Sequence, residues 1–256
     1  MLNLIFGFHS IDSYLNNNPE LIHTIYIDKN SKNSRLQIIL NQAKTKNIQV
    51  MLVDSKKLDQ MAINTKHQGI IAEIFQKNKS NLTLNQVLED LKDKSNLLFL
   101  ILDGITDPHN LGAILRTAEC FAVDAVIIPK HNSANADSAI VTKSSSGAIN
   151  HINLITVNNL NQAIEKLKEH QFWIAGTNLS DKSISLFDFK HTGNLAWVLG
   201  SEGSGLRRLV TENCDYLVSI PMLGQTQSLN VSVAAGIILS YSRFELKNQN
   251  AKTSKS

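Results

Sequence analysis

The sequence is poor in cysteine and has no long apolar run. Cys120 and Cys214 are its two cysteines, and neither stands in a CxxC or Cys/His cluster, so no metal site is expected. No stretch of about 18 apolar residues occurs, which argues against a membrane-spanning helix, and the first residues lack the basic and apolar regions of a secretory signal. These absences favour a cytoplasmic protein with reduced thiols and no membrane partner.

The charge of the chain is nearly balanced. Its 25 Lys and Arg against 22 Asp and Glu leave a formal net charge of +3, which neither requires nor excludes a polyanionic partner. Hydrophobic residues make up 43% of the sequence and charged residues 18%, so a buried core is expected and disorder only locally. The length of 256 residues favours two domains, one of them the smaller.

The first part of the chain is typical of a small α/β unit. Short β-branched and apolar runs at 25–27, 48–53 and 70–74 alternate with helical patterns. The polar, aperiodic segment that follows predicts a linker over 77–96, with a weak helix inside it. We therefore expect a separate domain at 1–76.

The second part has a stronger pattern and predicts a parallel sheet covered on both sides. Its continuous apolar runs alternate with amphipathic segments, such as 160–167, whose apolar residues repeat at helical spacing. We place this domain at 97–247 and a disordered tail at 248–256. The expected strands are 97–102, 125–128, 172–175, 195–199 and 216–220.

The first polar motif follows the expected strand 97–102 and extends over 103–119. A loop at the carboxyl end of a strand is where α/β proteins gather their ligands. Asn110 is placed to cap a helix that begins at Leu111, and Arg116 lies about 1.7 turns farther along it. The alternative is a plain helix cap followed by a solvated arginine.

A glycine-rich loop forms the second motif, directly after the expected strand 195–199. Gly200 and Gly205 have the GxxxxG spacing of a phosphate-binding loop, but no lysine follows the second glycine. The loop does not match GxGxxG either, and Glu202 would repel a pyrophosphate. What remains is a loop that lets its backbone approach a ligand closely. Its carboxylate suits a ligand with positive charge or donors, such as a sulfonium or an amino group.

The third motif runs over 219–236 and joins a strand to a helix of small residues. The strand stops at Pro221, a loop crosses, and Ser228 is placed to cap the helix that contains Ala234 and Gly236. Small residues let another backbone come close, so we expect this helix to pack tightly against the chain or a partner. An ordinary buried helix is the alternative.

Taken in this order, the three segments resemble the motifs of the SpoU family of the SPOUT methyltransferase class. They read NxxxxxR at 110–116, GSEGxG at 200–205 and SLNVSVA at 228–234. Gly7-Phe-His9 and His67-Gln-Gly69 further resemble the members that carry an N-terminal substrate-binding domain similar to ribosomal protein L30e.

The resemblance implies an α/β fold whose C-terminal parallel-sheet domain contains a trefoil knot, a homodimer that completes each site, and S-adenosylmethionine held mainly by backbone groups, without a metal. The implied substrate is 23S rRNA or its assembly intermediate, methylated on a guanosine ribose in the peptidyl-transferase region. A tRNA 2′-O-methyltransferase of the same family and a noncatalytic rRNA-binding assembly factor are the alternatives. Carried over by motif, the catalytic residues are Asn110, Arg116, Glu202, Ser228 and Asn230, and the cofactor residues are Gly176, Thr177, Gly200, Ile220, Met222 and Leu229.

Two roles are open for Arg116. The family assigns this arginine as the proton acceptor, but a guanidinium with a pKa above about 12 normally stays charged. A charged clamp that binds a phosphate and stabilises the developing alkoxide fits the residue as well. His109 is an alternative base, and Cys120, on the same expected helix, is expected to fill the core.

Overall fold

The structure, a computed structural model, divides the chain into two compact units, residues 1–79 and 80–256. No helix in the described part of the chain is long and apolar enough to cross a membrane. The described residues also contain no group of three or more His, Cys, Asp or Glu side chains that could hold a metal ion. The structure describes residues 2–31, 33–63, 65–75, 82–180, 182–201, 203–225 and 228–253.

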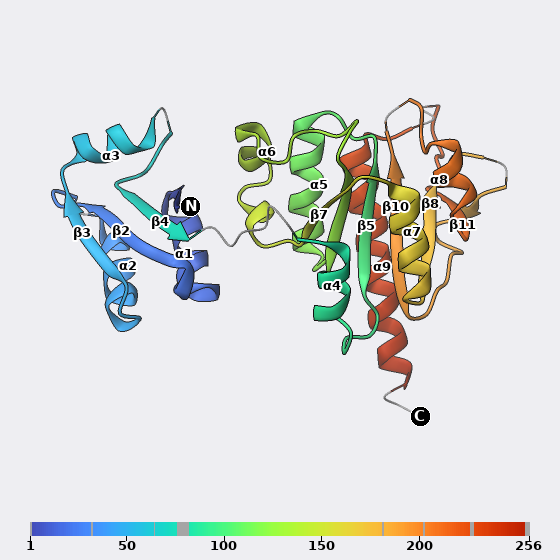
Figure 1. The fold of residues 1–256 in the computed structure, drawn as a ribbon, viewed down its shortest axis with the longest axis horizontal. Coiled ribbons are helices and arrows are strands. Elements are labelled where there is room, and N and C mark those ends of the chain that lie inside the picture. Colours follow the sequence, from blue (N-terminus) through green and yellow to red (C-terminus); the bar gives the residue numbers. More distant parts are fainter. Residues whose placement is uncertain are drawn as a thin grey trace. The chain divides into compact units, whose positions relative to one another are not determined.

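The first unit is a four-stranded mixed sheet with the strand order β1-β4-β2-β3 (Figure 1). The three strands expected here are confirmed as β2, β3 and β4, whereas β1, which pairs with β4 antiparallel, was not predicted. In chain order the elements are β1 (Leu2–Phe6), α1 (Phe8–Asn17), the 3₁₀ helix η1 (Pro19–Leu21), β2 (Ile22–Asp28), α2 (Ser34–Thr45), β3 (Gln49–Val53), α3 (Ser55–Ala62) and β4 (Ile70–Phe75).

Two buried clusters stabilise this unit, a larger one and a smaller one that contains Leu58 and Ala62 of α3 and Ile71 of β4. Leu36, Ile39 and Ala43 are buried at helical spacing along α2, and they pack in one cluster with Ile25 of β2 and Ile11 of α1. Burying these side chains removes apolar surface from water, which stabilises the unit in proportion to the area covered.

The second unit is built on a seven-stranded sheet with the order β7-β6-β5-β10-β8-β11-β9. Every strand pair in it is parallel, as predicted. The five expected strands are confirmed as β5, β6, β8, β10 and β11, but β7 and β9 were not predicted. The elements are α4 (Leu84–Asp90), β5 (Leu98–Asp103), α5 (Pro108–Cys120), β6 (Ala125–Pro129), α6 (Ala139–Ser144), the 3₁₀ helix η3 (Ala148–Asn150), β7 (Leu154–Val157), α7 (Leu160–Glu169), β8 (Phe172–Thr177), β9 (Ile184–Ser185), β10 (Asn194–Gly200), α8 (Arg208–Glu212), β11 (Tyr216–Ser219) and α9 (Val231–Thr253).

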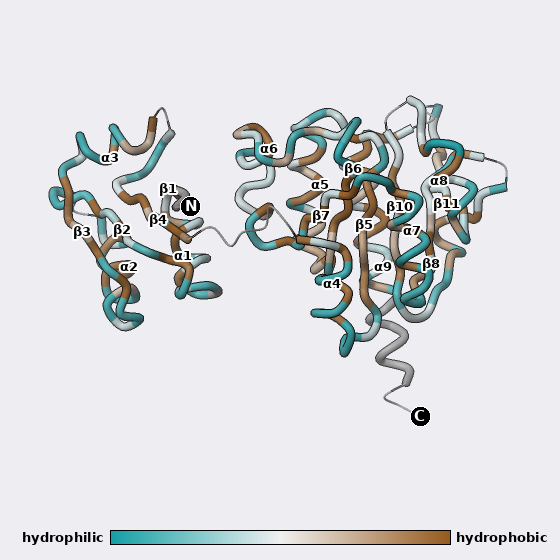
Figure 2. Tube along the Cα trace, in the orientation of Figure 1, coloured by the Kyte–Doolittle hydropathy of each residue, from teal (hydrophilic) through white to brown (hydrophobic). Residues whose placement is uncertain are grey.

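Helices cover both faces of this sheet, and its central strands are apolar along their length (Figure 2). Along β5, Leu98 and Leu100 face one buried cluster, together with residues of α5 and α9. Phe99 and Ile101 face the other, together with residues of α4 and α7. Side chains alternate across a strand, so a parallel strand buried on both faces has no polar position, and this explains the continuous apolar runs.

Two of the expected segment boundaries were wrong. Residues 84–91 were assigned to a linker, but they form α4 and its end, and Leu84, Val87 and Leu88 pack in the core of the second unit. The helix starts at a capping box in which Thr83 and Gln86 exchange hydrogen bonds, a local signal that the linker assignment overlooked. At the other end α9 continues to Thr253, so residues 248–253 are helical where a disordered tail was expected.

Strand β10 lies between β5 and β8, although β6, β7, β8 and β9 separate it from β5 in the chain. Leu195 through Gly200 are in register with Leu98 through Asp103 on one side, and Val198 pairs with Gly176 on the other. The strand order therefore reverses at β10. Because all seven strands are parallel, the carboxyl ends of β5, β10, β8 and β11 meet at one edge, where open α/β sheets bind ligands.

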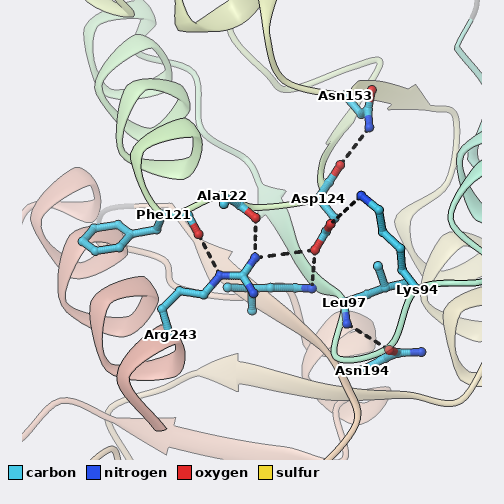
Figure 3. A network of polar contacts seen from close by, with 9 residues as sticks. Lys94, Leu97, Phe121, Ala122, Asp124, Asn153, Asn194 and Arg243 are labelled. Atoms are coloured by element: carbon cyan, nitrogen blue, oxygen red, sulfur yellow. Dashed lines mark hydrogen bonds and ion pairs between the residues drawn. The ribbon is translucent and has the colours of Figure 1, made fainter. Parts of the chain in front are cut away.

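Helix α9 is fixed at the opposite, amino end of β5 (Figure 3). Arg243 donates from Nε to the carbonyl oxygen of Phe121 at 2.7 Å and also contacts the carbonyl of Ala122 and the carboxylate of Asp124. The Asp124 carboxylate in turn accepts from the backbone N–H of Leu98 at 2.9 Å. The last helix is thus tied to the start of the first strand of the unit.

The close packing of α5 on α6 generates a stability prediction. A Cβ atom on Gly112 would overlap Ser144 Oγ and lie 3.0 Å from the backbone nitrogen of Ser145. We expect Gly112→Ala to lower the free energy of unfolding by about 1–3 kcal/mol, as overpacking does, although alanine is the better helix former. Chemical denaturation measures the change.

Ser144→Gly supplies the matched control, because it removes the overlapping side chain. The double variant should recover part of the loss, so that the two changes are non-additive. Additive effects would show that the contact between α5 and α6 is not the cause.

Candidate active site

The three polar motifs meet at the carboxyl edge of the second sheet. Asp103 is the last residue of β5, Gly200 of β10 and Thr177 of β8, and these strands are neighbours. The Thr177 hydroxyl donates to the carbonyl oxygen of Val198 at 3.3 Å, which joins β8 to β10 at this edge. Residues that are distant in the sequence therefore share one site because of the strand order.

Asp103 was not singled out in the sequence, although it ties two of the motifs together. Its side chain is fully buried, and it accepts from Arg207 twice, from the backbone N–H at 3.0 Å and from Nε at 2.6 Å. A buried carboxylate needs such partners, because losing its hydration is costly. The pair fixes the end of the glycine loop against the end of β5. The signal in the sequence was an aspartate that closes an otherwise apolar strand.

The glycine loop needs its first glycine because the chain crosses itself there. A Cβ atom on Gly200 would overlap the carbonyl group of Gly205 and lie 2.5 Å from the Leu206 nitrogen. Gly203 and Gly205 have φ angles of +88° and +64°, which side chains disfavour. The glycines therefore allow the loop to pack closely against itself, and the predicted approach of its backbone to a ligand stays a prediction. Glu202, the predicted carboxylate, lies outside the described residues.

Gly176 occupies a similar crowded position at the end of β8. A Cβ atom there would lie 2.7 Å from Cys214 Sγ and 2.8 Å from Leu206 Cδ1. The absence of a side chain lets the segment after the glycine loop pack onto β8. Gly176 and Gly200, two of the predicted cofactor residues, thus share a packing role. The same lack of a side chain would let a ligand come close to their backbone.

The loop between β11 and α9 contributes the remaining predicted cofactor residues. Ile220, Met222 and Leu229 are half-buried. No hydrogen bond joins the backbone of Met222 or Leu229 to another described residue. Their N–H and C=O groups therefore have no hydrogen-bond partner among the described residues. Ser228 is exposed in the same loop.

Asn110 and Asn230, 120 positions apart, are in direct contact. Asn230 Nδ2 donates to Asn110 Oδ1 at 3.0 Å, and Asn230 Oδ1 accepts from the backbone N–H of Ser232 at 2.9 Å. Both assigned caps were therefore wrong. Asp107, followed by a proline at the first helical position, caps α5, and Asn230 takes the capping position of α9 that Ser228 was expected to hold.

Arg116 lies on another face of α5. Its side chain is exposed, and no hydrogen bond or ion pair joins it to another described residue. Six residues after Asn110, it stands about 9 Å along the helix and about 120° around it. The structure therefore unites Asn110 with Asn230 but leaves Arg116 apart from both. Cys120 is exposed as well, so its expected core-filling role was wrong.

Two family profiles match the chain. One, described as the SpoU rRNA methylase family, matches residues 97–240, which is more than half of the chain. The chain belongs to the SpoU rRNA methylase family. The other, described as RNA 2′-O ribose methyltransferase substrate binding, matches residues 4–80 and therefore covers the first unit.

Relatives of the SpoU chain match it from end to end. The 23S rRNA (guanosine-2′-O-)-methyltransferase RlmB of Neisseria meningitidis serogroup B is 44% identical, over 96% of this chain and 97% of the relative. The RlmB of Haemophilus influenzae is 42% identical, over 97% of this chain and 98% of the relative.

Solved structures agree with the SpoU fold. The SpoU methyltransferase AviRb from Streptomyces viridochromogenes, in complex with AdoMet, has a TM-score of 0.73 at 20% identity and covers 96% of this chain and 91% of its own. The AdoMet-bound rRNA methyltransferase from Sinorhizobium meliloti has a TM-score of 0.72 at 19% identity, and the match covers 96% of this chain and 88% of that protein. At these identities the likeness shows the fold alone.

The bond between Asn110 and Asn230 generates a prediction for this SpoU site. Asn230→Asp keeps the oxygen that caps α9 but loses the donor to Asn110, whereas Asn110→Asp keeps its acceptor. We expect Asn230→Asp to lower the rate of methyl transfer by about tenfold or more, with a free energy of unfolding within about 1 kcal/mol of wild type. Asn110→Asp should cost less activity. Single-turnover kinetics and denaturation give both values, and equal losses would contradict the directional bond.

The cysteines of this SpoU chain should differ in reactivity. Burial raises the pKa of the Cys214 thiol to about 12, and its Sγ donates to the carbonyl oxygen of Val210 at 3.2 Å, whereas Cys120 is exposed. Iodoacetamide should therefore label Cys120 first at pH 8–9, because only the thiolate reacts. Mass spectrometry after graded labelling measures the sites.

The same raised pKa has a consequence for stability. The protonated thiol is favoured in the folded state, so its contribution is fully present below the unfolded pKa near 9 and is lost as the pH rises toward about 12. A Cys120→Ser variant, with one cysteine left, isolates the slow site. Fast labelling of Cys214 in this variant at pH 8 would contradict its burial.

Proposed function

We propose that the chain transfers a methyl group from S-adenosylmethionine to the ribose 2′-hydroxyl of a guanosine in 23S rRNA. The observation that carries the proposal is the contact between Asn110 and Asn230 at the edge of the sheet, in a chain that RlmB relatives match from end to end. By the same resemblance we place the guanosine in the peptidyl-transferase region.

The donor set at this edge fits the cofactor. The unpaired backbone groups of Met222 and Leu229 suit an adenine edge and ribose hydroxyls, which need donors and acceptors rather than charge. We assign Gly176, Thr177, Gly200, Ile220, Met222 and Leu229 to the cofactor. When bound, S-adenosylmethionine would supply a methyl group activated by its sulfonium. No metal is needed for this transfer.

A trefoil knot around this site is part of the proposal. The insertion of β10 between β5 and β8 and the return of the last helix α9 onto α5 support a chain whose end passes through an earlier loop. Such threading is rare.

In the proposed mechanism, Asn110 and Asn230 position the ribose, and Arg116 acts on its 2′-hydroxyl. The two amides, fixed to each other and to the first turn of α9, would hold the ribose so that its 2′-oxygen lies in line with the departing group. Arg116 would either accept the hydroxyl proton or stay charged and stabilise the alkoxide beside a phosphate. Glu202 and Ser228 complete the catalytic group that we propose.

The separation of Arg116 from the two asparagines supports a homodimer. A charged group that faces solvent in one subunit can complete the site of a second one. Helix α9 also exposes Val233 and Phe244, whose exposed fractions are 50% and 61%, and an apolar surface of this kind favours an interface. We therefore propose that two copies pair through α9 and that each supplies Arg116 to the other.

The first unit is proposed as the domain that recognises 23S rRNA or its assembly intermediate, because the substrate-binding profile matches it. Its similarity to ribosomal protein L30e stays a prediction. The proposed domains are residues 1–79 and 80–256.

The decisive test offers purified protein and labelled S-adenosylmethionine with 23S rRNA and, separately, with tRNA. We expect methylation of one guanosine in 23S rRNA, mapped by the resistance of its 3′ phosphodiester to alkaline cleavage. Methylation of tRNA alone would favour the tRNA alternative, and binding of rRNA without transfer would favour the assembly factor. A chain that starts at Asn81 should keep the cofactor and lose rRNA methylation, and equal activity without the first unit would contradict its role.

Arg116 can be tested by mixing two inactive variants. Arg116→Ala should lower the single-turnover rate by about 10²-fold or more with little change in RNA and cofactor affinity. If Arg116 acts on the partner's site, mixing it with Asn230→Ala should restore about a quarter of wild-type activity, because mixed dimers contain one intact site.

Arg116→Lys separates the two roles of the arginine. A rate that rises with pH supports a proton acceptor, and a low, flat profile supports a charged clamp. Intact chemistry at saturating RNA in Arg116→Ala, with weaker RNA binding, would show that the residue is a binding contact only.

A further inference from the structure

A pocket lies beside the candidate site and takes no part in the mechanism above. It has a volume of about 490 Å³, within the range of small-molecule sites. Its walls come from the end of β6, the first turn of α7 and the start of α8. The residues that carry its chemistry are His131, Asn158, Asn159, Asn161, Arg207 and Arg208.

The lining of this pocket combines positive charge, amides and an apolar base, and no carboxylate of the described residues lines it. Leu160 and Val210 are buried beneath it. His131 and Asn158 are exposed and make no hydrogen bond or ion pair to another described residue. The Arg208 side chain is 83% exposed, and its contact with Glu212 at 3.7 Å is a weak surface pair. These groups are therefore free to meet a ligand.

The pocket is joined to the candidate site through Arg207. This residue lines the pocket, and its Nε donates to Asp103 at the end of β5. The pocket also includes Pro129, the last residue of β6, which is the neighbour of β5 in the sheet. A ligand in the pocket and a ribose at the site would therefore approach the same edge of the sheet from adjacent strands.

We infer that this pocket binds one unstacked nucleotide of the RNA substrate, close to the methylated one. His131 would stack on the base, since unpaired bases are bound by aromatic side chains. Asn158 would pair with an edge of the base through its amide, and Arg208 would bind the phosphate. The inference rests on the proposed function and names a part of its substrate.

An abasic scan tests the pocket. A 23S rRNA fragment that contains the methylated guanosine is prepared with one abasic nucleotide at each position flanking it, and binding to the full chain is measured by fluorescence. Wild type should lose at least about fivefold affinity at one position. His131→Ala and Asn158→Ala should lose a similar factor with the intact fragment, and the abasic change at that position should then cost nothing more.

Arg208→Ala should weaken binding to every fragment and lower the slope of log affinity against log salt by about one. Lys92→Ala is the control for loss of one charge, because Lys92 is exposed in the turn after α4 and does not line the pocket. Glu212→Ala controls for loss of the surface pair. Both controls, and cofactor affinity in every variant, should match wild type.

A flat abasic scan, or equal losses in His131→Ala and in the Lys92→Ala control, would overturn the inference while methylation of 23S rRNA by wild type still supports the proposed function. If wild type transfers no methyl group, the proposed function fails, and the binding scan still decides whether the pocket takes a base.

Discussion

The candidate site depends on the hydrogen-bonded ion pair between the buried carboxylate of Asp103 and Arg207. Asp103 terminates an apolar strand and accepts from the backbone and the guanidinium of Arg207. Taking a carboxylate out of water costs several kcal/mol, and a hydrogen-bonded partner in good geometry offsets that cost only where the partner is held in place. The pair therefore favours one conformation of the glycine loop over others. Gly200, which would clash with Gly205 if it had a side chain, allows that conformation.

The pair between Asp103 and Arg207 also links β5 to β8. Arg207 ends the glycine loop, and Leu206 before it and Cys214 after it pack onto Gly176 of β8. The ends of β5, β10 and β8 are therefore held together by one ion pair and two glycines. A site built from loops needs a rigid support of this kind, because small displacements of positioning groups cost large factors in rate.

The strands of the second unit could be predicted because parallel strands buried on both faces are continuous apolar runs. β7 was missed because its alternate positions are exposed or half-buried, and β9 because it has two residues. The order of the strands could not be predicted, since nothing local in the sequence places β10 beside β5. Residues 77–96 were assigned to a linker because the helix inside them has a weak apolar pattern. Helix α4 is short and buries only three residues, so the capping box is the stronger signal for it.

The contact between Asn110 and Asn230 could not be predicted from the sequence. Asn110 and Asn230 were both named as catalytic, but each was given a wrong local setting, because Asp107 before Pro108 is the stronger cap signal and because a side chain's partner 120 positions away leaves no local trace. The contact matters chemically. Asn230 Oδ1 caps α9 by accepting from the backbone N–H of Ser232, and this orientation leaves Asn230 Nδ2 to donate to Asn110 Oδ1.

Arg116 takes no part in the contact between Asn110 and Asn230. One helix, α5, presents an asparagine toward α9 and an arginine about 120° away around its axis. Their side chains therefore leave the helix in different directions. Within one copy the arginine would have to reach the substrate around the helix, whereas a second copy packed on α9 could present its own arginine directly. The geometry of a single α-helix is thus the physical argument for a shared site.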